Sequence, residues 1–153
     1  MRLEELLRAD GVDAKVINAG VDGDKPIWML NRLQQGLTDQ TKIVVFEPGP
    51  NDINKSSNVD YSERVLAALQ KLNMPTIYIS HPSIQLNIDA RDTAAKYGAY
   101  YYGHWTKNIP VDRIYRQYDQ SSGAGHMTAD GCQLWASNIH PLVKHVIEER
   151  GIK

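Results

Sequence analysis

Polar groups that suit acyl chemistry gather in three short segments of this chain. Residues 18–24 and 49–52 are rich in glycine, asparagine and aspartate, and residues 125–128 contain a histidine beside a glycine. Backbone amides and asparagine side chains are suitable donors to an oxyanion that develops during a reaction. A histidine titrates near neutral pH and is suited to move protons as a general acid or base. The three segments together predict an acid–base site that also stabilises an oxyanion.

These groups are expected to meet because most of them follow β-prone runs. Four runs are predicted as strands: residues 15–18, 43–46, 76–79 and 99–102. The second run is entirely apolar, as expected of a strand that is buried on both faces. In open parallel sheets, ligands bind outside the carboxyl ends of the strands. His81 follows the third run and His104 the last, so one rim should collect the glycines, the asparagine and two or three histidines.

Helical patterns separate the β-prone runs. Helices are expected over residues 4–9 (ended by Gly11), after Pro26, from Asp60 with Glu63 three residues later, over residues 88–97, and at the C-terminal end. Three of them have apolar stripes: Trp28, Leu30, Leu33 and Leu37; Val65, Leu66, Leu69 and Leu72; and Trp135, Ile139, Leu142, Val143, Val146 and Ile147. Pro141 should kink the last helix. The alternation predicts a three-layer α/β/α fold with a parallel sheet, in a single domain over residues 1–153.

Composition and charge exclude several classes of protein. The formal net charge of −1 at pH 7 gives no electrostatic footprint for nucleic acid or an anionic membrane. No apolar run is long enough to span a bilayer, and the charged, leucine-containing start does not have the pattern of a signal peptide. The single cysteine, Cys132, excludes an intramolecular disulfide and a cysteine-rich metal site. We therefore expect a soluble, cytoplasmic protein with no nucleic-acid or membrane partner and no cofactor.

Each candidate group also has an ordinary structural interpretation. Asn-Ala-Gly and Gly-Pro-Asn-Asp are common turn sequences. The other histidines are expected to be structural, with His81 and His104 packed at the rim and His140 and His145 on the surface of the C-terminal helix. Cys132 is expected to pack near the start of that helix as a small apolar group. No metal is expected, because no known site has the spacing of the loop aspartates Asp22, Asp24 and Asp52.

Two of the chemistry-bearing segments resemble blocks of one enzyme family. Residues 16–24, Val-Ile-Asn-Ala-Gly-Val-Asp-Gly-Asp, and residues 47–52, Glu-Pro-Gly-Pro-Asn-Asp, are similar to the second and third blocks of the SGNH (GDSL-like) serine ester hydrolases. In that family a glycine amide of the second block contributes to the oxyanion hole, and Gly23 matches it. The asparagine of the third block is the side-chain donor, and Asn51 matches it.

The third segment resembles the fifth block of the same family. Residues 125–131, Gly-His-Met-Thr-Ala-Asp-Gly, precede Leu-Trp-Ala at 134–136, and the family's general base corresponds to His126. The resemblance extends from about Lys15 to about Val146. It implies a flavodoxin-like parallel sheet.

The chain departs from the family pattern in two places. The first block, Gly-Asp-Ser, holds the nucleophilic serine after an earlier strand and has no match, so we expect that first strand to be missing. The family's aspartate three residues before the histidine is replaced here by Gly123. Asp119 is the nearest upstream acid, and the loop over residues 120–125 could bring it back to orient His126. A backbone carbonyl is the alternative partner.

The resemblance implies an ester hydrolase that transfers acyl groups from small short-chain or acetyl esters to water. Without the serine block, activity should be weak unless another group replaces the nucleophile. Four serines lie near the predicted rim, although none has the family's strand-to-helix setting: Ser80, Ser83, Ser121 and Ser122. Two alternatives stay open. The first is a non-catalytic domain that binds acyl or carbohydrate ligands, and the second is a shortened product of a gene that encodes a complete enzyme.

The expected absence of a central strand has a structural consequence. In the family, that strand lies between the two represented here by residues 15–18 and 43–46, so two edges would keep unpaired backbone groups. Unsatisfied buried backbone groups cost roughly 1–3 kcal/mol each, and a whole strand of them exceeds the stability of an ordinary domain. We therefore expect a homodimer or larger assembly, formed through strand edges or the N-terminal helix, in preference to a closed-up monomer.

Overall fold

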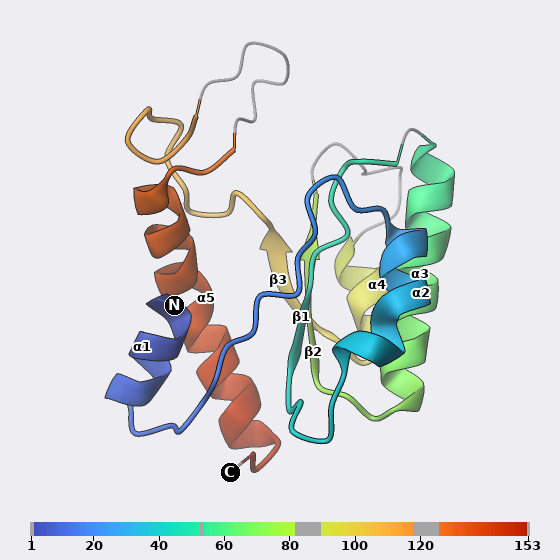
Figure 1. The fold of residues 1–153 in the computed structure, drawn as a ribbon, viewed down its shortest axis with the longest axis horizontal. Coiled ribbons are helices and arrows are strands. Elements are labelled where there is room, and N and C mark those ends of the chain that lie inside the picture. The colour runs from blue at the N-terminus through green and yellow to red at the C-terminus, as the bar shows by residue number, and fades with distance from the viewer. Residues whose placement is uncertain (1, 53, 82–89, 118–125, 153) are drawn as a thin grey trace. The chain divides into compact units, whose positions relative to one another are not determined.

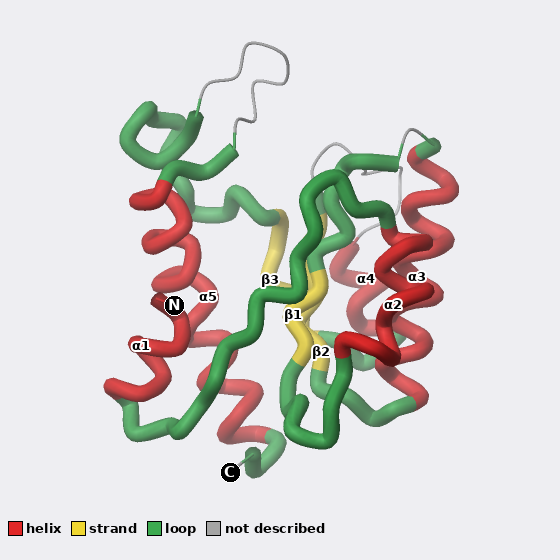
Figure 2. The backbone as a smooth tube through the Cα atoms, viewed as in Figure 1, coloured by secondary structure: helices red, strands yellow, loops and turns green. Residues whose placement is uncertain are grey.

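The computed structural model describes residues 2–52, 54–81, 90–117 and 126–152. The chain divides into two compact units. The sheet unit comprises Asn18–Trp105, and the terminal unit comprises Met1–Ile17 together with Thr106–Lys153. Figures 1 and 2 show the elements of each unit, which are described separately below. A single domain over residues 1–153 stays a prediction.

A parallel sheet of three strands forms the centre of the sheet unit. The strands are β1 (Val44–Phe46), β2 (Thr76–Ser80) and β3 (Tyr100–His104), in the order β1-β2-β3. All five residues of β2 are buried, as expected of a central strand. The fold is thus mixed α/β, with a parallel sheet flanked by helices. It is consistent with the three-layer α/β/α class that the sequence predicts.

Three helices cover one face of this sheet (Figure 1): α2 (Pro26–Gly36), α3 (Lys55–Lys71) and α4 (Ala90–Lys96). They share with the strands a cluster of buried residues: Phe46, Val65, Leu66, Leu69, Tyr78, Ala90 and Ala94. Burial of a large aliphatic side chain such as Leu66 or Leu69 contributes roughly 1.5–3 kcal/mol. This core fixes the helices against the strands and so holds the loops at the strand ends.

Two helices form most of the terminal unit, α1 (Arg2–Ala9) and α5 (Ala129–Glu149). They pack against each other, and Leu3 and Leu7 of α1 are buried. At the end of α1, the Asp10 carboxylate lies 2.9 Å from Lys144 Nζ and 3.0 Å from His140 Nε2. The helix α5 continues through Pro141. In the described part of the chain, no helix has the length and apolar character needed to cross a membrane.

The strand expected over residues 15–18 is wrong. Among the described residues this segment pairs with no strand, and Ile17 is 71% exposed. The Val16 N–H instead donates to the Glu4 carboxylate at 2.8 Å. A β-prone run forms a strand only where a neighbouring strand accepts and donates its backbone hydrogen bonds. Here the Glu4 side chain accepts the bond from the Val16 N–H instead.

The third helix begins earlier than its capping pattern predicted. The expected start was Asp60, whereas α3 begins at Lys55 with Asn54 as its N-cap. The Asn54 side chain accepts hydrogen bonds from the backbone N–H groups of Ser56 and Ser57, which satisfies donors that a helix start leaves unpaired. The first turn of α3 is polar, so hydrophobic periodicity does not show where this helix begins.

Several side chains differ in exposure from what the sequence predicts. Trp28 and Leu72 are half-exposed and not part of an apolar stripe. Val45 in β1 is 40% exposed, because successive side chains of a strand point to opposite faces, and its neighbours Val44 and Phe46 take the face that packs on the buried cluster. Cys132 is exposed and not packed. His140 is largely buried beside Asp10, not at the surface.

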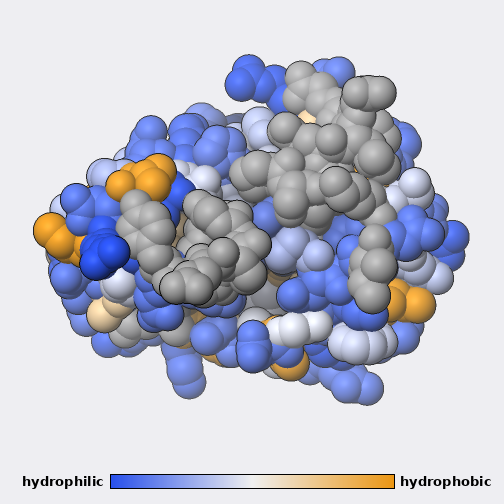
Figure 3. Space-filling view, turned by 90° about the horizontal axis from the view of Figure 1, so that it is seen from above, coloured by the Kyte–Doolittle hydropathy of each residue, from blue (hydrophilic) through white to orange (hydrophobic). Residues whose placement is uncertain are grey.

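Exposed apolar side chains are scattered. In Figure 3, hydrophobic residues among the described atoms form small separate groups within a mostly hydrophilic surface. Single exposed apolar side chains are common on protein surfaces and do not by themselves mark a docking site.

Candidate active site

Gly23 lies in a tight turn just before α2. The Asp24 N–H donates to the Val21 carbonyl at 3.2 Å, and Gly23 has φ +70°. Side-chain-bearing residues rarely adopt this backbone conformation, which explains the glycine. Gly23 is exposed, and among the described residues no acceptor takes its N–H. Its amide is therefore free to donate to a ligand.

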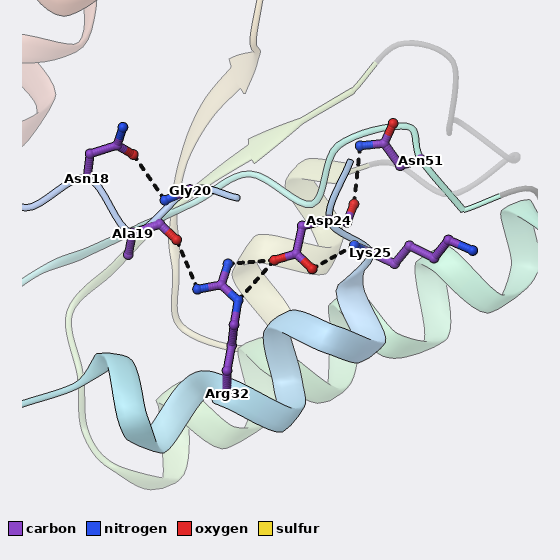
Figure 4. A network of polar contacts seen from close by, with 7 residues as sticks. All are labelled: Asn18, Ala19, Gly20, Asp24, Lys25, Arg32 and Asn51. Carbon is purple, nitrogen blue, oxygen red and sulfur yellow. Dashed lines mark hydrogen bonds and ion pairs between the residues drawn. The ribbon is translucent and has the colours of Figure 1, made fainter. Parts of the chain in front are cut away.

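Asn51 follows β1 in the second chemistry-bearing segment. Its side chain is exposed, and its Nδ2 donates to the Asp24 carbonyl at 3.2 Å (Figure 4). This bond joins Asn51 to the residue next to Gly23. An amide nitrogen has two N–H groups, so the second is left for a ligand. The structure therefore brings the two predicted oxyanion donors, Gly23 and Asn51, into neighbouring positions within the sheet unit.

An ion pair between a buried carboxylate and a partly exposed arginine anchors the Gly23 turn. The Asp24 carboxylate accepts bonds from Arg32 Nε at 3.0 Å and Nη2 at 2.5 Å, and from the Lys25 N–H at 3.0 Å. Arg32 Nη1 also donates to the Ala19 carbonyl at 2.9 Å (Figure 4). One arginine on α2 therefore holds the beginning and the end of the loop over residues 19–24.

The turn after β1 is fixed by a fully buried side chain of α3. Asn58 Nδ2 donates to the Gly49 carbonyl at 3.1 Å. Gly49 has φ +66°, and a β-carbon there would lie 3.6 Å from Asn51 Nδ2 and 3.9 Å from Glu47 Oε2. The Asn51 carboxamide and the Glu47 carboxyl thus flank the same glycine.

Glu47 is the most perturbed acid at this turn. Burial raises the pKa of its carboxyl from 4.5 to about 7, although a hydrogen bond from the Gly49 N–H, 3.1 Å from Oε1, acts in the opposite direction. A carboxyl that titrates near neutral pH beside a candidate donor can change the charge of the site in the physiological range.

The carboxyl ends of β2 and β3 bring two histidines together. His81 stacks on Trp105, with ring centroids 5.7 Å apart. Burial, and in second place the charge of His104, lower the pKa of His81. Ser80 is buried, and its hydroxyl lies 3.0 Å from the Tyr101 hydroxyl. These contacts are those of packed rim residues, and burial makes Ser80 a poor replacement nucleophile.

His126 lies in the terminal unit, in the approach to α5. Its carbonyl accepts a bond from the Gln117 N–H at 2.6 Å, and the neighbouring Met127 forms an antiparallel bridge with Arg116. His126 is exposed. The backbone before α5 is therefore braced by a second segment. The predicted meeting of His126 with Asn51 and Gly23 at one rim stays a prediction.

The start of α5 packs tightly against that second segment. Thr128 caps the helix by accepting from the Gly131 N–H at 3.1 Å, and its hydroxyl also donates to the Ile114 carbonyl. A β-carbon on Gly131 would lie 2.1 Å from the Tyr115 carbonyl oxygen. Only glycine fits this approach, so the glycine in Thr-Ala-Asp-Gly has a steric reason.

Some predicted site residues lie outside the described residues: the acid candidate Asp119, and the serines Ser83, Ser121 and Ser122. Arg32, Asn58 and Glu47 were missed, because their roles depend on tertiary contacts that no local motif signals. Among the described residues, no cluster of histidine, cysteine and acidic side chains could hold a metal ion.

Comparisons with known proteins give a likeness in structure only. No known family profile matches the chain, and no curated protein matches it in sequence. One solved structure that it resembles is a mutant of the esterase AlinE4, with a TM-score of 0.63 and 23% identity, over 94% of this chain and 82% of that one. At this identity the likeness shows a shared fold.

Proposed function

We propose that this chain is an ester hydrolase of the SGNH type that acts on small short-chain or acetyl esters. The observation that carries the proposal is the bond from Asn51 to the Asp24 carbonyl, which joins the asparagine to the turn of the free Gly23 amide. Two exposed donors on loops that are joined by a hydrogen bond are suited to a developing oxyanion. The esterase-like fold supports the same proposal.

The proposed chemistry is attack on the ester carbonyl with His126 as general base. We assign the attack to water, because the buried Ser80 at the carboxyl end of β2 is a poor nucleophile. The water oxygen bonds to the carbonyl carbon while His126 accepts its proton, and Gly23 and Asn51 donate to the oxyanion. Collapse breaks the ester C–O bond, and the leaving alkoxide takes the proton from His126. Enzymes deprived of their nucleophile keep roughly 10³–10⁴-fold catalysis over water, so slow turnover is expected.

Asn51→Ala is expected to lower kcat for 4-nitrophenyl acetate about a hundredfold, with little change in KM. An oxyanion donor acts mainly in the transition state and less on the bound ester. Initial rates over a range of substrate concentrations check this. Asn31→Ala, which changes an exposed asparagine of α2, is the matched control and should behave as the wild type. Unchanged turnover in Asn51→Ala would show that Asn51 is only a turn residue.

The binding-domain alternative makes a different prediction for the same protein. Absence of hydrolysis, together with saturable shifts of the Gly23 and Asn51 amide resonances on titration with acetate, would favour a ligand-binding domain that keeps the donors without the reaction.

We propose that the chain self-associates through the outer edge of β1. Within the described residues, β1 pairs only with β2. Its outer edge therefore presents unpaired backbone groups beside the exposed Val45, and such edges pair readily with a second chain. Sedimentation equilibrium at micromolar concentration should give at least a dimer mass. A monomer mass for a folded protein would refute this.

A further inference from the structure

The Asp24–Arg32 pair is more buried and more completely bonded than a surface ion pair. The Asp24 side chain is 4% exposed and accepts bonds from two nitrogens of Arg32 and from a backbone N–H. Both Arg32 nitrogens donate to Asp24 Oδ2 and the Lys25 N–H donates to Oδ1, so both oxygens of the carboxylate are held and its direction is fixed. Asp24 therefore has little freedom to move relative to α2.

The same arginine also sets the path of the loop that carries Gly23. Its third bond, to the Ala19 carbonyl, spans thirteen residues of sequence separation. Gly23 lies between Ala19 and Asp24, and its turn contains one backbone hydrogen bond of its own. Without the arginine, this exposed loop would keep that bond and the bonds of Asp24 with the Lys25 N–H and Asn51, but would lose both of its ties to α2 through Arg32.

The second donor depends on the first through Asp24. Asn51 donates to the Asp24 backbone carbonyl, whereas Arg32 binds the side chain of the same residue (Figure 4). A change in the position of Asp24 must therefore shift Asn51 as well. One continuous network runs from α2 through Asp24 to both donors.

We propose that Arg32 and Asp24 are positioning residues that preorganise the Gly23 amide and the Asn51 carboxamide as one donor pair. Only the catalytic consequence rests on the proposed function. Donors fixed in advance need no reorganisation when charge develops, so loss of the pair should lower kcat more than it changes KM.

The test follows the donors directly in ¹H–¹⁵N spectra of the full chain. In Arg32→Gln, we expect the Gly23 amide and the Asn51 side-chain amide to shift, and the Asn51 amide protons to exchange with solvent about tenfold faster, equivalent to one hydrogen bond. Arg32→Lys keeps the charge but cannot reproduce all three contacts, so it should fall between wild type and Arg32→Gln. Arg64→Gln, which removes the exposed Arg64–Asp60 pair, is the control and should leave both donors unchanged.

A purely structural role predicts a different result. It would lower the stability of Arg32→Gln while leaving the Asn51 and Gly23 resonances unmoved in the folded protein, and that outcome would overturn the proposal. If Arg32→Gln does not fold, Arg32→Lys decides by the same two resonances. Failure of the proposed function gives a different result. If the Gly23 and Asn51 resonances shift in Arg32→Gln but the protein hydrolyses no 4-nitrophenyl acetate, the positioning role is supported and only the esterase activity is refuted.

Discussion

Glu47→Gln is expected to stabilise the folded chain at pH 8 by roughly 3 kcal/mol and to leave its stability at pH 4 almost unchanged. The pKa of Glu47 is about 7 in the folded state, whereas an ordinary glutamate carboxyl has a pKa of 4.5. Between these values the folded state binds more protons than the unfolded state, so ionisation of Glu47 destabilises the fold as the pH rises through this window. Glutamine keeps the bond from the Gly49 N–H and never becomes charged.

Urea denaturation of both proteins at pH 4 and pH 8 measures this difference. The lowered pKa of His81 acts in the opposite direction, toward greater stability at higher pH, but it is present in both proteins and cancels in the comparison. Glu63→Gln is the control of opposite sign, because bonds from Lys96 and Tyr97 lower the pKa of Glu63 and its charge stabilises the fold. An unchanged difference between Glu47→Gln and wild type at the two pH values would show that Glu47 titrates normally.

The central strands and the long helices were predictable from the sequence because their signals are local. The β-prone run of β2 and the apolar stripe of α5 each contain enough residues to determine both type and place. Residues 15–18 have comparable β-propensity, yet form no strand. Pairing is a property of two segments, and the sequence of one segment does not reveal it.

The proximity of Gly23 and Asn51 could be predicted from the sequence, whereas the residues that hold their loops could not. Gly23 and Asn51 lie in turn sequences that resemble blocks of a known enzyme family, and this resemblance singles them out. Arg32 lies on a helix like many surface arginines, and only folding brings it to Asp24 and Ala19. The pKa of Glu47 depends on burial, which a single acidic residue after an apolar run does not indicate.

His126→Ala is expected to have the largest effect on activity. A general base contributes between roughly a hundredfold and ten-thousandfold to rate, so hydrolysis of 4-nitrophenyl acetate by His126→Ala should fall close to that of buffer. The structure places His126 on a braced and exposed segment before α5.

The matched control is another exposed histidine of the same unit. His145 lies on α5, with its Nε2 3.0 Å from the Glu149 carboxylate. His145→Ala removes an imidazole from the surface and should keep the wild-type rate. The control therefore distinguishes loss of the general base from loss of any surface histidine that reacts weakly with the ester.

The rate of 4-nitrophenyl acetate hydrolysis by wild type, His126→Ala and His145→Ala, measured side by side on purified protein, tests the proposed esterase most directly. The account predicts slow but saturable hydrolysis by wild type and His145→Ala, and background hydrolysis by His126→Ala. Equal rates for wild type and His126→Ala, or a wild-type rate no greater than that of buffer, would contradict it.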